Sequence, residues 1–336
     1  MPGQRGSSPP AVALPVRIAG TADVRCGRAV PTSEVARLAT GSWDAEDVER
    51  RTGIRSRQWV SEDAMLTSLG AQALQDALDE AGLPATALGR IIFASSAGGD
   101  MLAPAAANLI ARELGLTGTC DGFDLNNGCV GFLSALDVGG QTVVARRRPV
   151  GLVMVEPGSR YITPDDPRPY FVTGDGVAAV VLDAPRDGEG LLGLWLRNDG
   201  TTAGDVTIAH PGLTGKRETI RFHSSHAKIL EIAGAAVRRS VDNVLAESGL
   251  HLADIDWMVP HQPNGPLLDA VVHAVGIDPG RVVRTVHDTG SVGAASIPIG
   301  FHRLMHSGDL RPGDRVLMVG VGAGLAYGAA VYQVGR

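Results

Sequence analysis

Lysine, cysteine and aromatic residues are scarce in this sequence. Only Lys216 and Lys228 are lysines among 336 residues, and the net charge of −6 at pH 7 leaves no basic field for nucleic acid. The three cysteines, Cys26, Cys120 and Cys129, do not form a disulfide framework, so we expect a protein of the reducing cytoplasm. No apolar run approaches the roughly 18 residues of a membrane-spanning helix. The sequence therefore predicts a cytoplasmic protein that binds neither nucleic acid nor membranes.

Glycine, by contrast, is abundant. The chain has 44 glycines in 336 residues, about twice the usual share of roughly 7%. Because these glycines are spread through apolar segments, they predict tight turns and close backbone approaches rather than disorder. The hydrophobic fraction of 44% and the charged fraction of 20% are typical of a well-packed protein. Residues 1–10 are polar, rich in proline and glycine and without a signal-peptide core, so we expect a loose tail there.

Strand-like and helix-like segments alternate along the chain, a pattern typical of an α/β protein. The predicted strands are 16–20, 91–95, 149–155, 177–182, 191–197, 257–260, 315–319 and 325–334. The predicted helices are 65–81, 104–114, 130–136, 227–248 and 267–275. The turn-rich stretch 185–190 predicts a joint between two related halves, residues 14–186 and 187–336.

Cys129 stands where a predicted strand end meets a predicted helix start. Gly128 permits the tight turn that such an elbow needs. A thiol at a helix N-terminus lies against unpaired N–H groups and the positive end of the helix dipole, which lowers its pKa and favours the nucleophilic thiolate. The alternative is a small apolar core residue, because free cysteines are often buried.

Three further segments carry groups suited to a ligand site. His261 follows a short predicted strand, in the position where ligand crevices form in α/β sheets, although a structural, hydrogen-bonded histidine is the alternative. The segment 287–296 is a Gly/Ser-rich loop before a helix, with a plain helix cap as its alternative. The turn 320–324 would allow its backbone close to a ligand, or would form an ordinary hairpin.

Together these segments resemble the beta-ketoacyl synthase III branch of the thiolase fold. Six segments match in order over nearly the whole chain: 51–55, the Cys129 elbow, 174–176, 261–264, 290–296 and 320–324. The resemblance implies a five-layered αβαβα architecture built from two similar halves. It also implies a homodimer with active sites near the interface, the half with the nucleophilic Cys being 14–186 and the half with the catalytic His being 187–336.

The resemblance also implies the roles of individual residues. Cys129 would be the nucleophile that takes an acyl group from a thioester, and His261 the catalytic histidine. The backbone N–H groups of Cys129 and Gly324 would form the oxyanion hole. Arg51 and Asn264 would contact the phosphopantetheine or coenzyme A part of the substrate. No metal or separate cofactor is expected, since the acyl thioester is itself the substrate.

The chain departs from the family at the third catalytic position. The family pattern is Gly-Asn-Thr-Ser-Ala-Ala-Ser, and residues 290–296 read Gly-Ser-Val-Gly-Ala-Ala-Ser, so Ser291 replaces the Asn. An Asn amide would donate a hydrogen bond to the developing enolate. Loss of such a donor raises the activation free energy by on the order of 3 kcal/mol, which disfavours decarboxylative condensation. Acyl transfer needs only a thiol, a base and an oxyanion hole. Ser291 would orient His261 or bind the acceptor, and Asp288 is an alternative carboxylate partner for His261.

Two further departures concern the acyl donor. The family places a Trp four residues before Arg51, where this chain has Asp47, and Trp43 lies about one helical turn away. Weaker adenine stacking would favour a carrier-protein thioester over acyl coenzyme A. Pro266 occupies a position where the family carries a basic residue for carrier-protein docking. Candidate replacements are Arg221, Lys228, Arg238 and Arg239.

Small residues in the stretch 97–104 suggest a roomy acyl pocket, since the family often places a bulky residue from the partner subunit there. An acyl group larger than acetyl, aromatic or branched, would fit such a pocket. The alternative is a mobile interface loop without a role in substrate choice.

The sequence thus predicts a ketosynthase III-like acyltransferase of the EC 2.3.1 class in polyketide or other specialised metabolism. It would form an acyl-Cys129 thioester from an acyl-carrier-protein or coenzyme A thioester. It would then pass the acyl group to a carrier-protein thiol or to a hydroxyl or amine acceptor. One alternative is a decarboxylating 3-oxoacyl-[acyl-carrier-protein] synthase III that uses malonyl carrier protein. The other is a non-catalytic partner subunit of a synthase.

Overall fold

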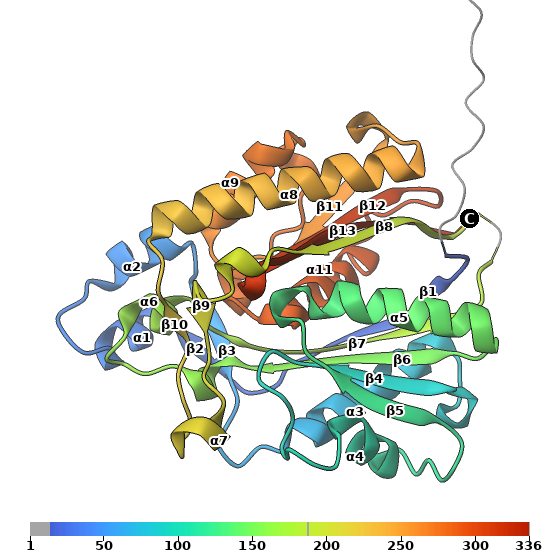
Figure 1. Cartoon of the computed structure of the whole chain (residues 1–336), viewed down its shortest axis with the longest axis horizontal. Helices are drawn as coiled ribbons and strands as arrows, with labels where there is room; N and C mark the ends of the chain where they lie inside the picture. The colour runs from blue at the N-terminus through green and yellow to red at the C-terminus, as the bar shows by residue number, and fades with distance from the viewer. Residues whose placement is uncertain (1–13, 187, 336) are drawn as a thin grey trace, which may run out of the picture.

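The computed structural model describes residues 14–186 and 188–335, so the predicted tail at residues 1–10 lies outside the described residues. Two β-sheets are stacked with helices between them and on both outer faces (Figure 1). The strands of one sheet come from residues 17–183 and those of the other from residues 190–333.

The first sheet has five strands in the order β1-β7-β6-β4-β5. Their bounds are β1 Arg17–Val24, β4 Arg90–Ala94, β5 Asp121–Leu125, β6 Val150–Pro157 and β7 Asp175–Asp183. Strand β4 pairs in parallel with β5 and β6, and β7 pairs antiparallel with β6 and β1. Parallel strands need both faces covered, and the uninterrupted burial of β6 fits that requirement.

The second sheet repeats this arrangement with four strands in the order β11-β12-β13-β8. Their bounds are β8 Gly190–Asn198, β11 Trp257–Pro260, β12 Arg315–Gly322 and β13 Ala326–Gln333. Strand β11 is parallel to β12, whereas β13 is antiparallel to both of its neighbours. A parallel bridge between Met258 and Val282 stands where β5 pairs in the first sheet. The two sheets therefore share one strand order.

Helices form three layers around the sheets (Figure 1). Helices α3 (Leu66–Ala81) and α4 (Ala106–Glu113) cover the outer face of the first sheet, and α8 (His226–Ser248) and α9 (Gly265–Val275) cover that of the second. Helices α5 (Gly131–Arg146) and α11 (Ser296–Met305) fill the layer between the sheets. This is the five-layered αβαβα arrangement of the thiolase fold that the sequence predicted.

The central position of α5 explains its apolar composition. Residues 128–146 are long and apolar enough to cross a membrane by length and composition alone, which corrects the expectation that no segment approaches that limit. Both sheets cover this helix, and a Cβ at Gly139 would lie 2.9 Å from Leu152 of β6. Close packing between two sheets, rather than contact with lipid, therefore accounts for the apolar and glycine-rich sequence.

Shorter elements gather at one end of the layers and form a cap. In the first half they are β2 (Arg28–Pro31), α1 (Thr32–Leu38), α2 (Ala45–Thr52), β3 (Ser56–Trp59) and α6 (Pro167–Val172). In the second half they are β9 (Val206–Thr207), α7 (Pro211–Thr214), β10 (Arg221–Phe222) and α10 (Val286–Thr289). The fully buried Arg57 holds part of the cap together, because its guanidinium donates to Thr32 Oγ1 at 3.0 Å and to the Phe171 carbonyl at 2.6 Å.

Candidate active site

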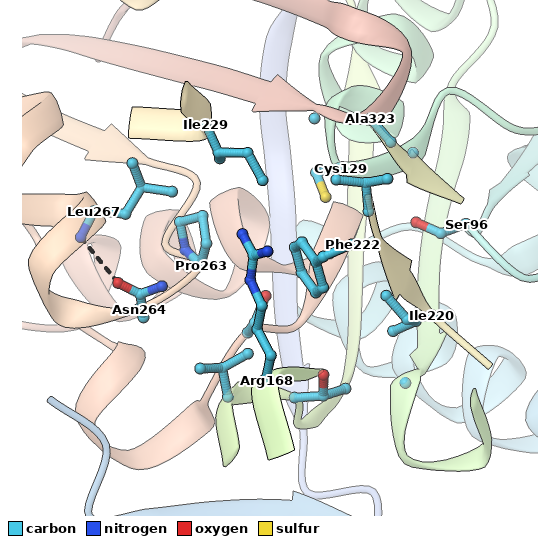
Figure 2. Close-up of a pocket in the computed structure, with 18 of the residues that line it drawn as sticks. Ser96, Cys129, Arg168, Ile220, Phe222, Ile229, Pro263, Asn264, Leu267 and Ala323 are labelled. Atoms are coloured by element: carbon cyan, nitrogen blue, oxygen red, sulfur yellow. Dashed lines mark hydrogen bonds between the residues drawn. The ribbon is translucent and has the colours of Figure 1, made fainter. Parts of the chain in front are cut away.

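A cavity of about 980 Å³ opens under the cap and is lined by the turns before α5 and α11 (Figure 2). All six residues expected to form the site line it: Arg51, Cys129, His261, Asn264, Ser291 and Gly324. They come from α2, from the turn before α5, from the segment after β11, from the loop between α10 and α11 and from the turn after β12. The fold therefore brings both halves of the chain to one cavity.

A tight elbow presents Cys129 to this cavity. The residue lies in a 3₁₀ turn, Gly128–Val130, between β5 and α5, and Gly128 has φ +52°, a left-handed conformation that favours glycine. The Gly128 N–H donates to Asn126 Oδ1 at 3.1 Å. A Cβ at Gly322 would lie 3.0 Å from the backbone nitrogen of Cys129, so the end of β12 packs directly against the elbow. The predicted strand-to-helix turn is confirmed.

The expectation that Cys129 has a lowered pKa and rests as a thiolate is wrong. Burial raises the pKa of the thiol to about 12, and the neighbouring Glu156 carboxylate adds to the increase. A backbone hydrogen bond to Cys129 lowers the pKa of the thiol but does not outweigh these two effects. Cys129 is therefore a thiol in the resting protein, and its proton must be removed when it attacks.

His261 is held immediately after β11 and is only 3% exposed. Its backbone N–H donates to the Val319 carbonyl at 2.8 Å. Burial lowers the pKa of the imidazole to about 4, so the ring is neutral and can accept a proton. Nδ1 is buried and has no hydrogen-bond partner among the residues that the structure describes.

The structure does not place Asp288 as the partner of His261. Its two carboxylate oxygens accept hydrogen bonds from Arg303 Nη1 at 2.9 and 3.0 Å. The alternative in which Asp288 orients the imidazole is therefore wrong. Ser291 does not orient the ring through Nδ1 either, because that atom has no partner within the described chain.

Gln262, which the sequence analysis did not single out, fixes the segment that carries His261. Its backbone N–H donates to Ser296 Oγ at 3.0 Å, and its Oε1 accepts from the N–H groups of Thr285 and Val286 at 2.8 and 3.0 Å. Gln262 is fully buried, so these bonds form in a low-dielectric setting where they are strong. In the sequence, the available signal was an amide side chain directly after the candidate histidine.

Backbone hydrogen bonds hold Ser291 at the edge of the cavity. Its N–H donates to the Val172 carbonyl at 2.7 Å, and its carbonyl accepts from Gly174 N–H at 3.0 Å. The Gly-Asp-Gly motif at 174–176 thus supports the Ser291 loop. Within this motif Asp175 accepts from Val60 N–H at 2.7 Å and Ser159 N–H at 2.6 Å, and burial raises its pKa to about 6.

Gly324 and Asn264 complete the predicted set. Gly324 has φ +126° in the turn after β12, a conformation open to glycine and strained for other residues. Asn264 caps α9, because its Oδ1 accepts from Leu267 N–H at 2.9 Å (Figure 2). The Asn264 Oδ1 thus serves the cap, and its amide NH₂ is available for a ligand.

Two arginines and a tryptophan also line the cavity. Arg51 Nε pairs with Asp47 Oδ2 at 2.7 Å, and Arg168 stacks over Phe222 with 4.3 Å from its guanidinium carbon to the ring centre. Trp43 lines the same cavity although it lies one helical turn from the family position. The loss of the aromatic residue at Asp47 is thus offset in space, which weakens the argument against coenzyme A.

Three of the four candidate docking cations are already paired with acidic residues. Arg221 lies 3.7 Å from Asp166, and Lys228 lies 3.1 Å from Asp205. Arg238 lies 3.3 Å from Asp242. Lys228 lies in the first turn of α8 next to cavity residue Ile229, and Arg221 lies between cavity residues Ile220 and Phe222, so these two are the best placed.

Much of the apolar wall of the cavity comes from the second half, from its cap and from the first turns of α8 and α9, which the sequence analysis did not assign. These side chains are Val206, Ile208, Ile220, Phe222, Ile229 and Leu267. Ile220, Phe222, Ile229 and Leu267 are labelled in Figure 2. From the stretch 97–104, Ala97 alone lines the cavity, whereas Leu102 is 89% exposed.

Glu156 is a second residue that the sequence analysis missed. It lies at the end of β6, is 5% exposed and lines the cavity with Cys129. Burial raises the pKa of its carboxyl to about 7, and hydrogen bonds from Ala294 and Ser96 act in the opposite direction. A Glu at the end of an otherwise apolar strand, Val150–Pro157, was the signal in the sequence.

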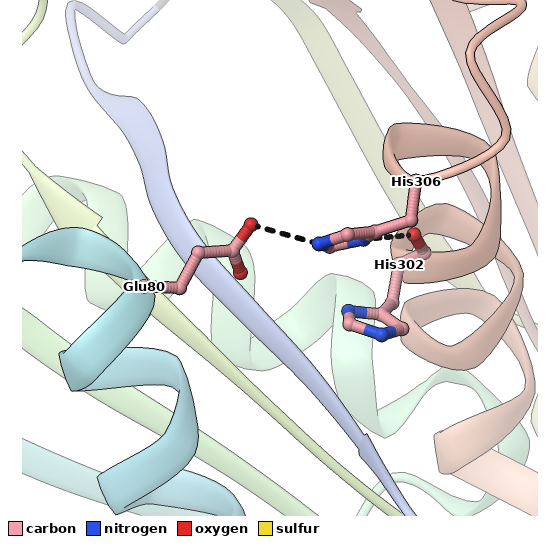
Figure 3. Close-up of side chains that lie close together, drawn as sticks. All are labelled: Glu80, His302 and His306. Carbon is pink, nitrogen blue, oxygen red and sulfur yellow. Dashed lines mark hydrogen bonds and ion pairs between the residues drawn. The ribbon is translucent and has the colours of Figure 1, made fainter.

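One group of side chains could hold a metal ion, among the residues that the structure describes. Glu80 of α3, His302 of α11 and His306 place their ligand atoms within 4.8 Å of one another (Figure 3). Glu80 Oε1 lies 3.2 Å from His306 Nε2, and Thr21 bonds both Glu80 and His302. None of the three lines the active-site cavity. Their mutual contacts connect α3 to the end of α11.

The fold and the cavity with its half-buried Cys129 and buried His261 define a thiolase-fold enzyme. Residues 123–200 match the family model described as 3-Oxoacyl-[acyl-carrier-protein (ACP)] synthase III, and residues 245–334 match the model of its C-terminal part. The Beta-ketoacyl-[acyl-carrier-protein] synthase III of Neisseria meningitidis serogroup C is 31% identical over 319 residues, which cover 94% of this chain and 98% of the relative.

Solved structures give the same result. The 3-oxoacyl-(acyl carrier protein) synthase III of Pseudomonas aeruginosa is 29% identical with a TM-score of 0.86, covering 96% of this chain and 98% of that one. The priming beta-ketosynthase of the R1128 polyketide biosynthetic pathway is 28% identical with a TM-score of 0.88, covering 98% and 99%. This chain therefore belongs to the 3-oxoacyl-[acyl-carrier-protein] synthase III family, whose members transfer acyl groups.

Proposed function

We propose that this protein is an acyltransferase that loads an acyl group onto Cys129 and passes it on without decarboxylative condensation. The observation that carries the proposal is the single cavity that joins Cys129 and His261 while Ser291 stands where the family has an Asn. Acyl transfer needs the thiol, a base and an oxyanion hole, whereas condensation also needs donors for an enolate.

In the first half-reaction neutral His261 takes the proton of the Cys129 thiol as the sulfur attacks the thioester carbonyl. The lowered pKa of His261 keeps its ring neutral, so a nitrogen is free to take the proton of a thiol that is protonated at rest. The N–H groups of Cys129 and Gly324 stabilise the oxyanion. The thiol of the donor leaves with the proton from His261, and acyl-Cys129 remains.

The donor in this proposal is an acyl-carrier-protein thioester, with acyl coenzyme A as the second choice. Arg51 and Arg168 line the cavity and supply cations for the phosphate of either phosphopantetheine group. Asn264 offers its amide NH₂ to the pantetheine arm. The apolar wall around Phe222 and Ile229 would contact an acyl group larger than acetyl.

Intact-mass spectrometry tests this function. The wild-type protein should gain the mass of the acyl group when incubated with acyl carrier protein carrying an aromatic or branched acyl chain. Subsequent addition of malonyl carrier protein should release no carbon dioxide. If a 3-oxoacyl product forms instead, the transfer-only function is wrong and the protein is a condensing synthase.

The condensing synthase is the second candidate, because the relatives with 28–31% identity are named as such synthases. The priming beta-ketosynthase among them supports a place in polyketide or other specialised metabolism. A non-catalytic subunit is the weakest alternative, since the cavity retains both Cys129 and His261. A protein that fails to take up any acyl group from the donor would favour that alternative.

A homodimer in the cytoplasm belongs to the same proposal. Strand β5 is an edge of the first sheet, and Leu102 in the nearby loop is 89% exposed. Edge strands and exposed apolar side chains are typical of surfaces that a second copy covers. Light scattering should give a dimer for the wild type and a monomer for Leu102→Asp; a wild-type monomer would contradict the proposal. The free cysteines agree with a reducing compartment.

A further inference from the structure

Glu156 is the acidic residue inside the cavity that the proposed first half-reaction does not use. It is the penultimate residue of β6 (Val150–Pro157) and lines the same cavity as Cys129 and His261. A carboxyl group that is 5% exposed gains little from such a position unless it has a function, because its charged form is costly there.

Hydrogen bonds hold the carboxyl by one oxygen. Oε1 accepts from Ser96 N–H at 3.0 Å, from Ser96 Oγ at 2.9 Å and from Ala294 N–H at 3.0 Å. No side chain or backbone group within residues 14–186 and 188–335 bonds Oε2. Three donors on Oε1 fix the orientation of the group, and Oε2 is left as the oxygen that a bound molecule can reach.

Gly293 makes the room for this carboxyl. A Cβ at Gly293 would lie 2.7 Å from Glu156 Cδ and 2.9 Å from Oε1. Gly293 stands where the family pattern Gly-Asn-Thr-Ser-Ala-Ala-Ser has its first Ser. A side chain at 293 and the Glu156 carboxyl therefore compete for one space, and this chain gives that space to the carboxyl.

We propose that Glu156 is a further catalytic residue, which removes the proton of a hydroxyl acceptor as that acceptor attacks acyl-Cys129. The inference rests on the proposed transfer function and names the substrate class of its second half-reaction. The acceptor oxygen bonds to the acyl carbon, the bond from that carbon to Cys129 Sγ breaks, and the product is an ester. The acceptor proton goes to Glu156 Oε2 and then to the leaving sulfur, which restores the thiol without any oxidant or reductant.

The chemistry explains why a hydroxyl acceptor needs this group. A thiol ionises readily enough to attack with a weak base, whereas an alcohol attacks only when a positioned base takes its proton. A carboxylate in the same place repels the carboxylate of a malonyl group, so it also disfavours condensation. Both consequences agree with the replacement of the family Asn by Ser291.

The charge state of Glu156 sets the pH range of this step. The groups that face it are the Cys129 thiol, Asp175 of β7 and the neutral His261 across the cavity. Since burial raises the pKa of Glu156 to about 7, the carboxylate form predominates above that pH. Attack by a hydroxyl should therefore accelerate as the pH rises through about 7 and then level off.

Deacylation of preformed acyl-Cys129 tests the proposal with four nucleophiles. Water and methanol are O–H acceptors, pantetheine is a thiol acceptor, and hydroxylamine needs no base. In Glu156→Gln the rates with water and methanol should fall about 100-fold at pH 8 and lose their inflection near pH 7. The rates with pantetheine and hydroxylamine should change less than about threefold, because these reactions do not use the carboxylate.

Three results overturn the proposal: unchanged rates with water and methanol, an equal loss with all four nucleophiles, or a pH inflection that persists in Glu156→Gln. Gly293→Ala is the second variant, since its Cβ displaces the carboxyl without removing it, and it should show the same selective loss. Thermal unfolding and acyl uptake verify that both variants are folded. If the wild type never takes up an acyl group, the proposed function fails; if it does and Glu156→Gln deacylates normally, only this inference fails.

Discussion

The turns before the two central helices have the same geometry and different contents. Gly128–Val130 precedes α5 and Gly293–Ala295 precedes α11, and each is a 3₁₀ turn that opens with a glycine of positive φ, +52° and +47°. The end of a strand from the other half closes each turn. Gly322 of β12 packs on Cys129 in the first turn, and Glu156 of β6 bonds Ala294 in the second.

This difference shows how the same backbone geometry can present a thiol in one turn and a carboxyl group in the other. Where the closing strand ends in a glycine, the backbone approaches closely enough to enclose a thiol. Where its penultimate residue is a glutamate, as in β6, the same space holds an acid fixed by three donors. Similar folds thus leave the chemistry to the few residues at strand ends and turns. Four predictions, made on three variants, test this comparison.

The largest effect is expected from Cys129→Ala, which removes the nucleophile. Acyl uptake from an acyl thioester should be abolished, a loss of at least about 1,000-fold, because no other group in the cavity can form the thioester. Intact-mass spectrometry measures it. Cys120→Ala is the matched control, since Cys120 does not line the cavity, and it should take up the acyl group normally. Acyl uptake by Cys129→Ala would show that the nucleophile is elsewhere.

Gly322→Ala disturbs the first turn without touching the thiol itself. Its Cβ would lie 3.0 Å from both the Cβ and the backbone nitrogen of Cys129, so the elbow must shift by a few tenths of an ångström. The rate of acylation should fall about 10- to 100-fold, because small misplacements of a reacting atom are costly.

Gly204→Ala serves as its control, since a Cβ there meets nothing within 4 Å. Single-turnover acylation compares the two variants. An unchanged rate in Gly322→Ala would mean that close packing of β12 does not position Cys129.

Glu156→Gln changes the stability of the second turn in a pH-dependent way. The carboxyl is buried, which raises its folded-state pKa to about 7, above the ordinary value for a glutamate. Its contribution to stability is therefore complete at low pH and is lost as the pH rises through about 7. At pH 8 the buried charge costs on the order of 3 kcal/mol, so the variant should be more stable there by a similar amount.

Urea unfolding at pH 5 and pH 8 measures this difference. At pH 5 the wild type and Glu156→Gln should have nearly equal free energies of unfolding. Glu247→Gln on the exposed face of α8 is the control and should show no such pH dependence. Equal stability of Glu156→Gln and wild type at pH 8 would mean that the charged form is not penalised.

The smallest effect concerns the reactivity of the thiol. Cys129 in the wild type should react with iodoacetamide far more slowly than a free thiol at pH 7, because burial and Glu156 raise its pKa to about 12. Glu156→Gln should increase that rate severalfold by removing one of the two causes. Peptide mass spectrometry separates Cys129 from Cys26 and Cys120. Rapid alkylation in the wild type would indicate a thiolate at rest.

Long periodic segments were predicted well from the sequence. The helix expected over 65–81 is α3 (Leu66–Ala81), and the strand expected over 257–260 is β11 (Trp257–Pro260). The helix expected over 130–136 continues to Arg146, past Asp137 and Gln141, which bond each other at 2.7 Å. Strands β9 and β10 were missed, because two residues carry no period that can be recognised.

In the candidate site, too, local sequence features were predicted well and contacts between distant segments were not. Cys129 and Gly324 were recognisable because their glycine-rich turns are local features of the sequence. Trp43 was misjudged because its place in the cavity depends on how the cap folds over α2, not on helical spacing. Asp288 was misjudged because Arg303, fifteen residues further along the chain, occupies its carboxylate.

By itself, the sequence determined the long elements, the fold family and six of the residues that meet in one cavity. These follow from local rules, since turns, caps and hydrophobic periods depend on neighbours along the chain. The tertiary structure alone decided the protonation states of Cys129, His261 and Glu156. It also decided that the Glu156 carboxyl fills the space that Gly293 leaves open. Burial and charge at a site are sums over groups far apart in sequence, and only folding brings those groups within reach of one another.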